Sequence, residues 1–209
     1  MKLIENLNWR YATKYFDTSK KVNSDNLELL KEAIRLSPSS YGLQQYKVLI
    51  VEKSEIKEQL KEAAYGQGQL TDSSHVFVFC HYLNVSGDMI DNYIEQKAKA
   101  EDVAIDRISG YGTFIKNTVS AMDTKDMVHW SRRQTYLAVA NLLTACAELK
   151  IDACPMEGFE HDRFDDILGL ADKGLASAII VPVGYRSDSD QTQFVPKVRK
   201  ATNEMFETI

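Results

Sequence analysis

The chain is poor in the residues that mark specialised protein classes. Its 209 residues include three cysteines, four prolines and ten glycines, so a disulfide framework, a collagen-like repeat and a low-complexity segment are all excluded. No stretch approaches about 18 consecutive apolar residues, and the N-terminal segment lacks the apolar centre of a secretory signal. Cys80, Cys146 and Cys154 show no metal-ligand spacing, so no metal site is expected. We therefore expect a cytoplasmic protein with reduced thiols.

The charge balance is mildly acidic. There are 25 Lys and Arg residues against 30 Asp and Glu residues, which gives a formal net charge of −5. This balance argues against a general nucleic-acid or membrane-surface binder, but it leaves room for a local basic pocket. At 44% hydrophobic and 26% charged residues, the composition is that of an ordinary globular domain. Because no repeat or linker divides the chain, we predict a single domain over residues 1–209.

Hydrophobic periodicity predicts alternating helices and strands. We expect helices over 24–36, 54–64, 88–108 and 131–149, strands over 46–52, 76–80 and 178–183, a short extended segment at 151–154, and a polar, weakly helical tail over 191–209. The helix at 131–149 is the most apolar and should be central. Pro182 indicates a sheet edge or a strand end. Few strands among many helices predict a three-layer α/β or α+β domain with a small central sheet.

Several familiar catalytic signatures are missing. The chain has no GxxxxGK[ST] phosphate loop, no GxSxG elbow and no HExxH helix. Gly66-Gln67-Gly68 lacks the third glycine of a dinucleotide-binding fingerprint. The four histidines are scattered along the chain. These absences direct attention to cationic and polar residues near the two ends.

Four cations lie near the chain ends in two pairs. Arg10 and Lys14 are four residues apart, and Lys197 and Arg199 are two apart, so each pair can share one face. They are either two solvated surface pairs or the parts of one phosphate site, since arginine forks match phosphate oxygens. Spacing does not choose between these. Segments 37–45 and 155–159 leave a similar choice between a plain turn and a ligand-facing loop.

Together these segments resemble the flavin-dependent nitroreductase family, in particular its bacterial branch of oxygen-insensitive nitroreductases and dihydropteridine reductases. The resemblance is carried by residues 10–17, 36–45, 73–80, 134–137, 155–159, 181–185 and 196–199. Their order and spacing cover nearly the whole chain. The resemblance implies an α+β, nitroreductase-like three-layer fold, with a small and mainly antiparallel central sheet flanked by helices. It also implies an intertwined homodimer with FMN in its interface.

The resemblance assigns the cations to the cofactor. Arg10, Lys197 and Arg199 would hold the FMN phosphate, and Lys14 would reach the pyrimidine side of the flavin ring. Ala12 stands where the family motif has serine, which removes one hydroxyl donor. Each charge-assisted hydrogen bond to the phosphate would contribute roughly 1.5–3 kcal/mol, so the remaining cations can still hold it.

The resemblance also implies contacts to the ring. The backbone of Glu157 and Gly158 would orient flavin N5, so no side chain is assigned as catalytic. The loop at 39–44 would reach the flavin of the partner subunit. The full cofactor-binding set expected is Arg10, Tyr11, Ala12, Lys14, Pro38, Ser39, Ser40, Gly42, Gln44, Gln67, Gln69, Pro155, Met156, Glu157, Gly158, Lys197 and Arg199.

The implied activity is that of an FMN-dependent NAD(P)H oxidoreductase. It would reduce nitroaromatics, quinones or similar small acceptors by ping-pong hydride transfer through flavin N5. Tyr41, Tyr111 and Phe114 are the candidates that would sort acceptors at the ring face. One alternative is the same scaffold reducing a pteridine, an enone or a halogenated aromatic. Another is a flavin-binding protein that turns over slowly. Neither a nucleic-acid nor a membrane partner is expected.

Overall fold

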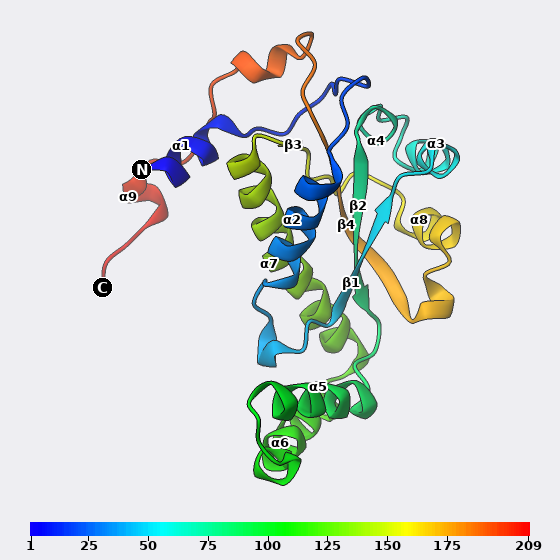
Figure 1. Cartoon of the computed structure of the whole chain (residues 1–209), viewed down its shortest axis with the longest axis vertical. Helices are drawn as coiled ribbons and strands as arrows, with labels where there is room; N and C mark the ends of the chain where they lie inside the picture. The colour runs from blue at the N-terminus through cyan, green and yellow to red at the C-terminus, as the bar shows by residue number, and fades with distance from the viewer.

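A four-stranded antiparallel sheet lies between two layers of helices (Figure 1). The computed structural model describes all 209 residues. The strand order is β1-β2-β4-β3, with β1 at Tyr46–Val51, β2 at His75–Tyr82, β4 at Leu175–Gly184 and β3 at Asp152–Ala153. All three neighbouring pairs are antiparallel. The α+β class and the small central antiparallel sheet expected from the sequence are therefore confirmed.

Strand β2 divides its side chains between two apolar cores. Phe77 and Phe79 face α2 (Ser24–Arg35) and α7 (Thr124–Leu149), whereas Val76 and Val78 face α3 (Ser54–Ala63) and α8 (His161–Leu168). This division follows from the two-residue period of a strand. All four side chains are fully buried, and burial of a side chain of this size contributes roughly 1.5–3 kcal/mol. The continuous apolar run in β2 thus reflects a sheet covered on both faces.

Helix α7 is the long central helix, and it begins earlier than the sequence pattern suggested. It spans 26 residues, or about 39 Å. The Asp123 side chain caps its first turn by accepting a hydrogen bond of 2.8 Å from the Asp126 amide. The first turn is polar, and the buried Met127 and Trp130 that follow pack against α5 (Gly87–Ala100) and α6 (Ser109–Ser120) rather than against the sheet. The helix ends where Lys150 takes a left-handed conformation with φ 58°.

The remaining helices are shorter. They are α1 (Lys2–Trp9), α4 (Gln69–Asp72), α5 (Gly87–Ala100), α6 (Ser109–Ser120) and α9 (Thr202–Met205). The single helix expected over 88–108 is wrong, because α5 ends at Ala100 and Asp102 takes φ 52° before α6 begins. Helices α1 and α8 were not expected; each is only eight residues long, and α8 packs Phe164, Ile167 and Leu168 against the core. None of the helices has the length and apolar character needed to cross a membrane.

Pro182 lies in the central strand β4, so the expectation of a sheet edge is wrong and that of a strand end is right. It comes two residues before the end of β4, and its carbonyl accepts a hydrogen bond of 3.0 Å from the Cys154 amide. The backbone N and C=O of a strand residue point to the same side, so the N of Pro182, which carries no hydrogen, points toward Cys154, one residue beyond the end of β3. A proline is tolerated there because β3 has already ended.

The three cysteines are buried and unpaired. Burial raises the pKa of the Cys80 thiol to about 12. Burial also raises the pKa of Cys146 to about 12 and raises that of Cys154. All three side chains are therefore neutral thiols near pH 7 and pack as small apolar groups.

Candidate functional site

Cations from the two ends of the chain gather beside the C-terminal end of α7. The Lys197 ammonium donates a hydrogen bond to the backbone carbonyl of Asn8. The pKa of Arg10 is lowered by burial and by the nearby Arg199. The pKa of Lys197 is lowered by burial, then by Arg10 and Arg199. The structure therefore brings together the three cations that the family resemblance assigns to one phosphate.

This cluster has no counter-ion within the chain. None of Arg10, Lys197 and Arg199 forms an ion pair with a carboxylate. Cations that repel one another at close range favour a multiply charged anion, and arginine forks suit phosphate oxygens in particular. The donor set therefore fits a phosphate group.

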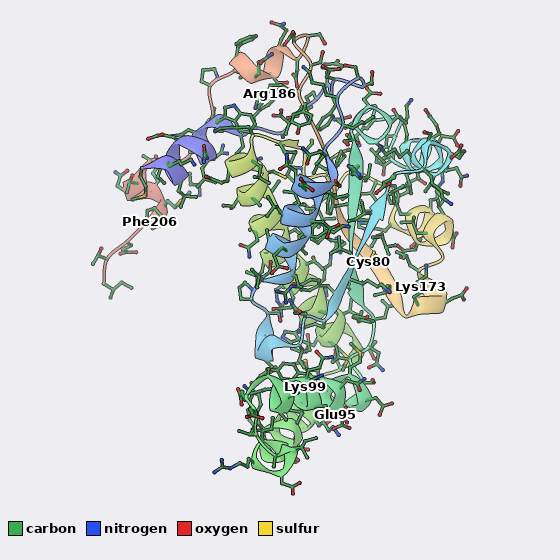
Figure 2. All side chains as sticks on the ribbon, viewed as in Figure 1. Cys80, Glu95, Lys99, Lys173, Arg186 and Phe206 are labelled. Carbon is green, nitrogen blue, oxygen red and sulfur yellow. The ribbon has the colours of Figure 1, made fainter.

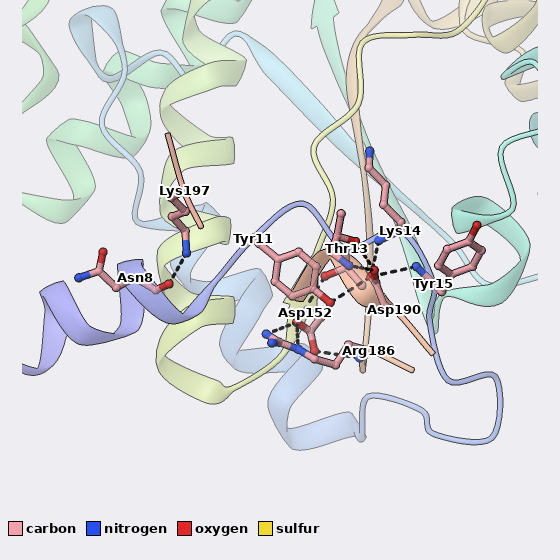
Figure 3. A network of polar contacts seen from close by, with 10 residues as sticks. Asn8, Tyr11, Thr13, Lys14, Tyr15, Asp152, Arg186, Asp190 and Lys197 are labelled. Atoms are coloured by element: carbon pink, nitrogen blue, oxygen red, sulfur yellow. Dashed lines mark hydrogen bonds and ion pairs between the residues drawn. The ribbon is translucent and has the colours of Figure 1, made fainter. Parts of the chain in front are cut away.

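A buried carboxylate anchors the segment that carries Lys14. Asp190 accepts hydrogen bonds from the amide of Lys14 at 2.8 Å, the amide of Tyr15 at 3.2 Å and the hydroxyl of Tyr11 at 3.0 Å (Figure 3). Although burial by itself raises the pKa of Asp190, its hydrogen bonds from Thr192, Lys14 and Tyr15 outweigh this and lower it. The carboxylate stays ionised and fixes the backbone on both sides of Lys14.

A second buried acid supports the same segment. Asp152 pairs with Arg186 at an Nη2–Oδ1 distance of 2.6 Å and also accepts from the Arg186 backbone amide at 2.8 Å. The Arg186 guanidinium lies 4.2 Å from the ring centroid of Trp9 and 4.5 Å from that of Tyr11. Ala12, exposed at the position of the family's serine, bridges to Ala153 in parallel. The backbone on both sides of Arg10 is thus held in place by contacts to Ala153 and Arg186.

The turn at 155–158 presents two free backbone donors. The amides of Glu157 and Gly158 donate to no acceptor in the chain. The Gln67 amide group donates to the Gly158 carbonyl at 2.8 Å, and the Tyr136 hydroxyl donates to the Glu157 carboxylate. Met156 pairs with Ile180 of β4 through two backbone hydrogen bonds. The rigid base of this turn leaves its N–H groups available to a ligand.

The structure places the other expected residues of this region nearby but with weaker roles. Pro155 is half-buried in the same turn. Gln69 is buried at the start of α4, and no hydrogen bond joins its side chain to the turn. Gln67 therefore lies beside the 155–158 turn, whereas no contact joins Gln69 to it.

The loop at 39–44 is held in an unusual backbone conformation. Tyr41, Gly42 and Gln44 have positive φ values of 59°, 78° and 46°. A Cβ added to Gly42 would lie 2.9 Å from the Tyr93 hydroxyl oxygen, so a larger residue here would have to displace the Tyr93 side chain as well as adopt a positive φ. The Ser40 amide donates to the Gln134 side chain at 2.9 Å. Non-glycine residues in this region of backbone space often mark functional loops.

An aromatic cluster adjoins this loop. The Tyr41 and Phe114 rings meet edge to face at a centroid distance of 6.2 Å, and Tyr111 stacks on Phe114 at 6.5 Å. Tyr41 also meets Trp130 of α7 at 6.2 Å. Phe114 remains 55% exposed, so an aromatic surface faces outward. All three residues expected to sort acceptors therefore lie together.

Further expected residues complete the loop. Ser39 accepts a hydrogen bond of 2.8 Å from the Gln44 amide, and the Gln44 side chain donates to the Arg35 carbonyl at 2.7 Å. Pro38 is exposed at the loop's start. These contacts fix the loop to the end of α2 rather than to the cation cluster.

One chain does not bring the loop and the cations together (Figure 1). The loop contacts α7 at Gln134, whereas the N-terminal segment contacts Lys150 at the far end of that helix. These positions are about 24 Å apart along the helix axis. Gln134 and Tyr136 also project from nearly opposite sides of α7, so the loop and the 155–158 turn lie on different faces. The expected site exists as two separate parts.

Sequence reasoning missed the acids and the stacked arginine that support the site. Asp152, Arg186 and Asp190 belong to no motif, and their partners lie far away in the sequence. Asp190 and Lys14, for example, are 176 residues apart. No local pattern signals such a contact.

Comparison with known proteins identifies the family. The model of the nitroreductase family matches residues 7–185. Over 218 aligned residues the chain is 32% identical to YfkO of Bacillus subtilis (strain 168), which is named as a candidate NAD(P)H nitroreductase, covering 99% of this chain and 97% of that protein. It is 33% identical to SH0546 of Staphylococcus haemolyticus, which is named likewise, covering 99% and 97%.

Solved structures show the same fold. A candidate nitroreductase of Bacillus subtilis, ydfN, superposes with a TM-score of 0.89 at 20% identity, covering 100% of this chain and 99% of that one. A candidate nitroreductase of Exiguobacterium sibiricum in complex with FMN gives 0.84 at 18%, covering 99% and 97%. The enone reductase CLA-ER gives 0.81 at 16%, also covering 99% and 97%. The resemblance inferred from the sequence is confirmed, and the chain belongs to the nitroreductase family.

Proposed function

We propose that this protein is an FMN-dependent NAD(P)H oxidoreductase that reduces nitroaromatics, quinones or similar small acceptors. The observation that carries the proposal is the cluster of Arg10, Lys197 and Arg199 without a carboxylate partner. The relatives named for NAD(P)H nitroreductase activity and the neighbour in complex with FMN support the choice of cofactors. When bound, FMN would supply hydride transfer through N5, from NAD(P)H to the acceptor in ping-pong order.

The chain's own residues would bind and orient the cofactor. Arg10, Lys197 and Arg199 would hold its phosphate through charge-assisted hydrogen bonds. Lys14 would lie on the pyrimidine side of the ring. The free amides of Glu157 and Gly158 would donate toward the ring edge, and Gln67 would fix the turn that carries them. No side chain is required as an acid or base for hydride transfer itself.

We extend the proposal to a homodimer in which each chain completes the site of the other. The loop at 39–44 and the cluster of Tyr41, Tyr111 and Phe114 would cover the ring held by the partner. The separation of the two part-sites along α7 supports this arrangement. A site completed by two chains would also exclude water from the flavin ring during hydride transfer, because the loop and aromatic cluster of one chain would cover the ring held by the other.

Exposed apolar side chains also support the dimer. Leu137 on α7 is 44% exposed, and Phe194 and Phe206 of the tail are 72% and 68% exposed. Figure 2 shows Phe206 on a C-terminal segment that projects away from the body of the chain. β1 is an edge strand with apolar grooves on both faces, of about 480 and 440 Å³. Apolar surfaces of this extent usually meet a partner, and we propose an intertwined pairing.

The structural likeness to an enone reductase favours a conjugated enone as the second candidate acceptor on the same scaffold. Unpaired, buried thiols and a nicotinamide donor both suit a reducing compartment, so we propose the cytoplasm as the location.

The test begins with the purified protein, which is expected to be yellow. Flavin released by heat should elute as FMN on chromatography, because the chain has a compact cation cluster but no dinucleotide fingerprint that would take the pyrophosphate and adenosine of FAD. Anaerobic NADPH or NADH should bleach the colour within seconds, and a panel of nitroaromatics, quinones and enones should restore it. Yellow protein that is not bleached would support slow flavin binding instead. Colourless protein that FMN cannot reconstitute would contradict the proposal.

A further inference from the structure

Asp190 is a fully buried carboxylate without a cationic partner. Its Oδ2 accepts hydrogen bonds from the amides of Lys14 and Tyr15 and from the hydroxyl of Tyr11. Its Oδ1 accepts from the amide of Thr192 at 3.0 Å and from the hydroxyl of the same residue. Every donor is neutral. A buried carboxylate that lacks a cationic partner stays ionised only when several hydrogen bonds stabilise its charge, as they do here.

The contrast with Asp152 separates two kinds of buried acid. Asp152 has the guanidinium of Arg186 as a counter-charge at 2.6 Å, so it forms an ion pair of the usual structural kind. Asp190 instead holds its negative charge against neutral donors alone, namely three backbone amides and two hydroxyl groups. A carboxylate that accepts several amide hydrogen bonds fixes the backbone direction more closely than an ion pair between long side chains does.

The segments that Asp190 joins are those that carry the proposed cofactor contacts. Residues 11–15 lie directly after Arg10 and include Lys14, and Thr192 lies five residues before Lys197. Figure 3 shows the Lys14 side chain leaving its backbone in the direction away from Asp190. The Lys14 ammonium therefore remains available to a ligand even though its own amide is held by an acid.

We propose that Asp190 is a positioning residue that acts through Lys14: it sets where the Lys14 ammonium stands and thereby tunes the reduction potential of the bound flavin. This inference rests on the proposed function. Reduction adds negative charge to the pyrimidine side of the ring, and an ammonium held nearby favours the reduced cofactor. A loosened Lys14 backbone would weaken that attraction.

The primary test compares Asp190→Asn with Asp188→Asn. Asp188 is an exposed acid in the same loop, so it controls for the loss of one negative charge. Asparagine at 190 keeps the size of the side chain but loses the charge and one of the two acceptor oxygens. We expect a roughly tenfold weaker Kd for FMN, measured by titrating apoprotein, and a more negative midpoint potential. Asp188→Asn should leave both unchanged.

A double-mutant cycle distinguishes positioning from a general structural role. Lys14→Gln should also make the midpoint potential more negative. If Asp190 acts through Lys14, adding Asp190→Asn to Lys14→Gln should shift the potential little further. Additive shifts, or a normal potential in Asp190→Asn beside a shifted one in Lys14→Gln, would overturn the inference while the proposed function stands. Wild-type protein that binds no FMN would instead overturn the proposed function.

A milder variant covers the case in which Asp190→Asn does not fold. Thr192→Val removes one hydroxyl donor to Asp190 and leaves the carboxylate in place. We expect a smaller shift of the potential in the same direction, and Thr192→Ser should restore the wild-type value. An unchanged potential in Thr192→Val, together with unfolded Asp190→Asn, would assign Asp190 to folding alone and overturn the inference.

Discussion

The ammonium of Lys197 donates a hydrogen bond to the backbone carbonyl oxygen of Asn8, a residue 189 positions earlier in the chain. This bond holds the C-terminal segment against the residues that lead into Arg10. The first and last parts of the sequence therefore form one cationic surface. None of Arg10, Lys197 and Arg199 forms an ion pair within the chain, which is consistent with the proposed phosphate site.

Removing either end of this surface should weaken FMN binding. Arg10→Ala and Arg199→Ala each remove charge-assisted hydrogen bonds worth roughly 1.5–3 kcal/mol, or about ten- to a hundredfold in affinity. The double variant should show less than the summed loss, because both residues share one phosphate. Fluorescence quenching of FMN by apoprotein measures this. Arg163→Ala, an exposed arginine on α8, is the matched control. Wild-type affinity in both single variants would contradict the shared phosphate site.

The proposed dimer predicts complementation between damaged chains. Light scattering should give about twice the chain mass of 23.7 kDa. Mixed dimers of an Arg10→Ala chain with a Gly42→Val chain should retain one intact site, since one site then combines an undamaged cation cluster with an undamaged loop. Flavin content per mixed dimer measures this against each parental dimer. A monomer mass at micromolar concentration, or mixed dimers without flavin, would argue against shared sites.

Gly42 should tolerate alanine less well than Gly66. Both have positive φ, 78° and 75° respectively, but only the Cβ at 42 meets another atom, the Tyr93 hydroxyl at 2.9 Å. Gly66→Ala should therefore lose about 1 kcal/mol of unfolding free energy from backbone strain alone. Gly42→Ala should lose about 1–3 kcal/mol more from the steric clash. Urea denaturation measures both. Equal losses would show that the loop moves away from Tyr93 at no penalty.

Stability should rise with pH between about 8 and 9 because of Lys57. Its ammonium donates to the carbonyls of Ser73 at 2.8 Å and Ser74 at 2.9 Å, and burial, then the nearby Lys21, lower its pKa from 10.5 to about 8. The unfolded chain binds more protons than the folded one above pH 8, so the free energy of unfolding increases with pH. The gain is about 1 kcal/mol over that unit.

The control for this prediction is Lys57→Met, which removes the titrating group and should lose the gain. Lys53→Met, at an exposed position before α3, should keep it. Urea midpoints at pH 8 and 9 for the three proteins provide the comparison. A gain that persists in Lys57→Met would place its origin elsewhere.

The strands and amphipathic helices were predictable because burial leaves a pattern. The run around Phe77 is apolar throughout since both faces of β2 are covered, and α2 shows its buried face at Leu27, Leu30 and Ile34. Helices α1 and α8 were missed because eight residues make only about two turns, too few for a helical period to stand out, even though Phe164, Ile167 and Leu168 share one face of α8. The break after α5 depends on the left-handed residue Asp102, which composition does not reveal.

The candidate site was predictable only through resemblance. Spacing alone did not choose between two solvated surface pairs and one shared phosphate site for Arg10 and Arg199, and only the family pattern favoured the shared site. The contacts of Asp190 and Arg186 could not be predicted from the sequence, because their partners, the Lys14 amide and the Trp9 ring, lie far away along the chain. The separation of the 39–44 loop from the cations is likewise a property of the folded length of α7.

The three buried thiols have a practical consequence. Thiolates, not thiols, react with maleimides and iodoacetamide, and the raised pKa values leave almost no thiolate in the native chain at neutral pH. The native cysteines should therefore not react with these labelling reagents in the folded protein. A cysteine introduced at exposed Val198 would be the single reactive handle, so spin labels placed there could report how far apart two C-terminal segments lie without first removing any native cysteine.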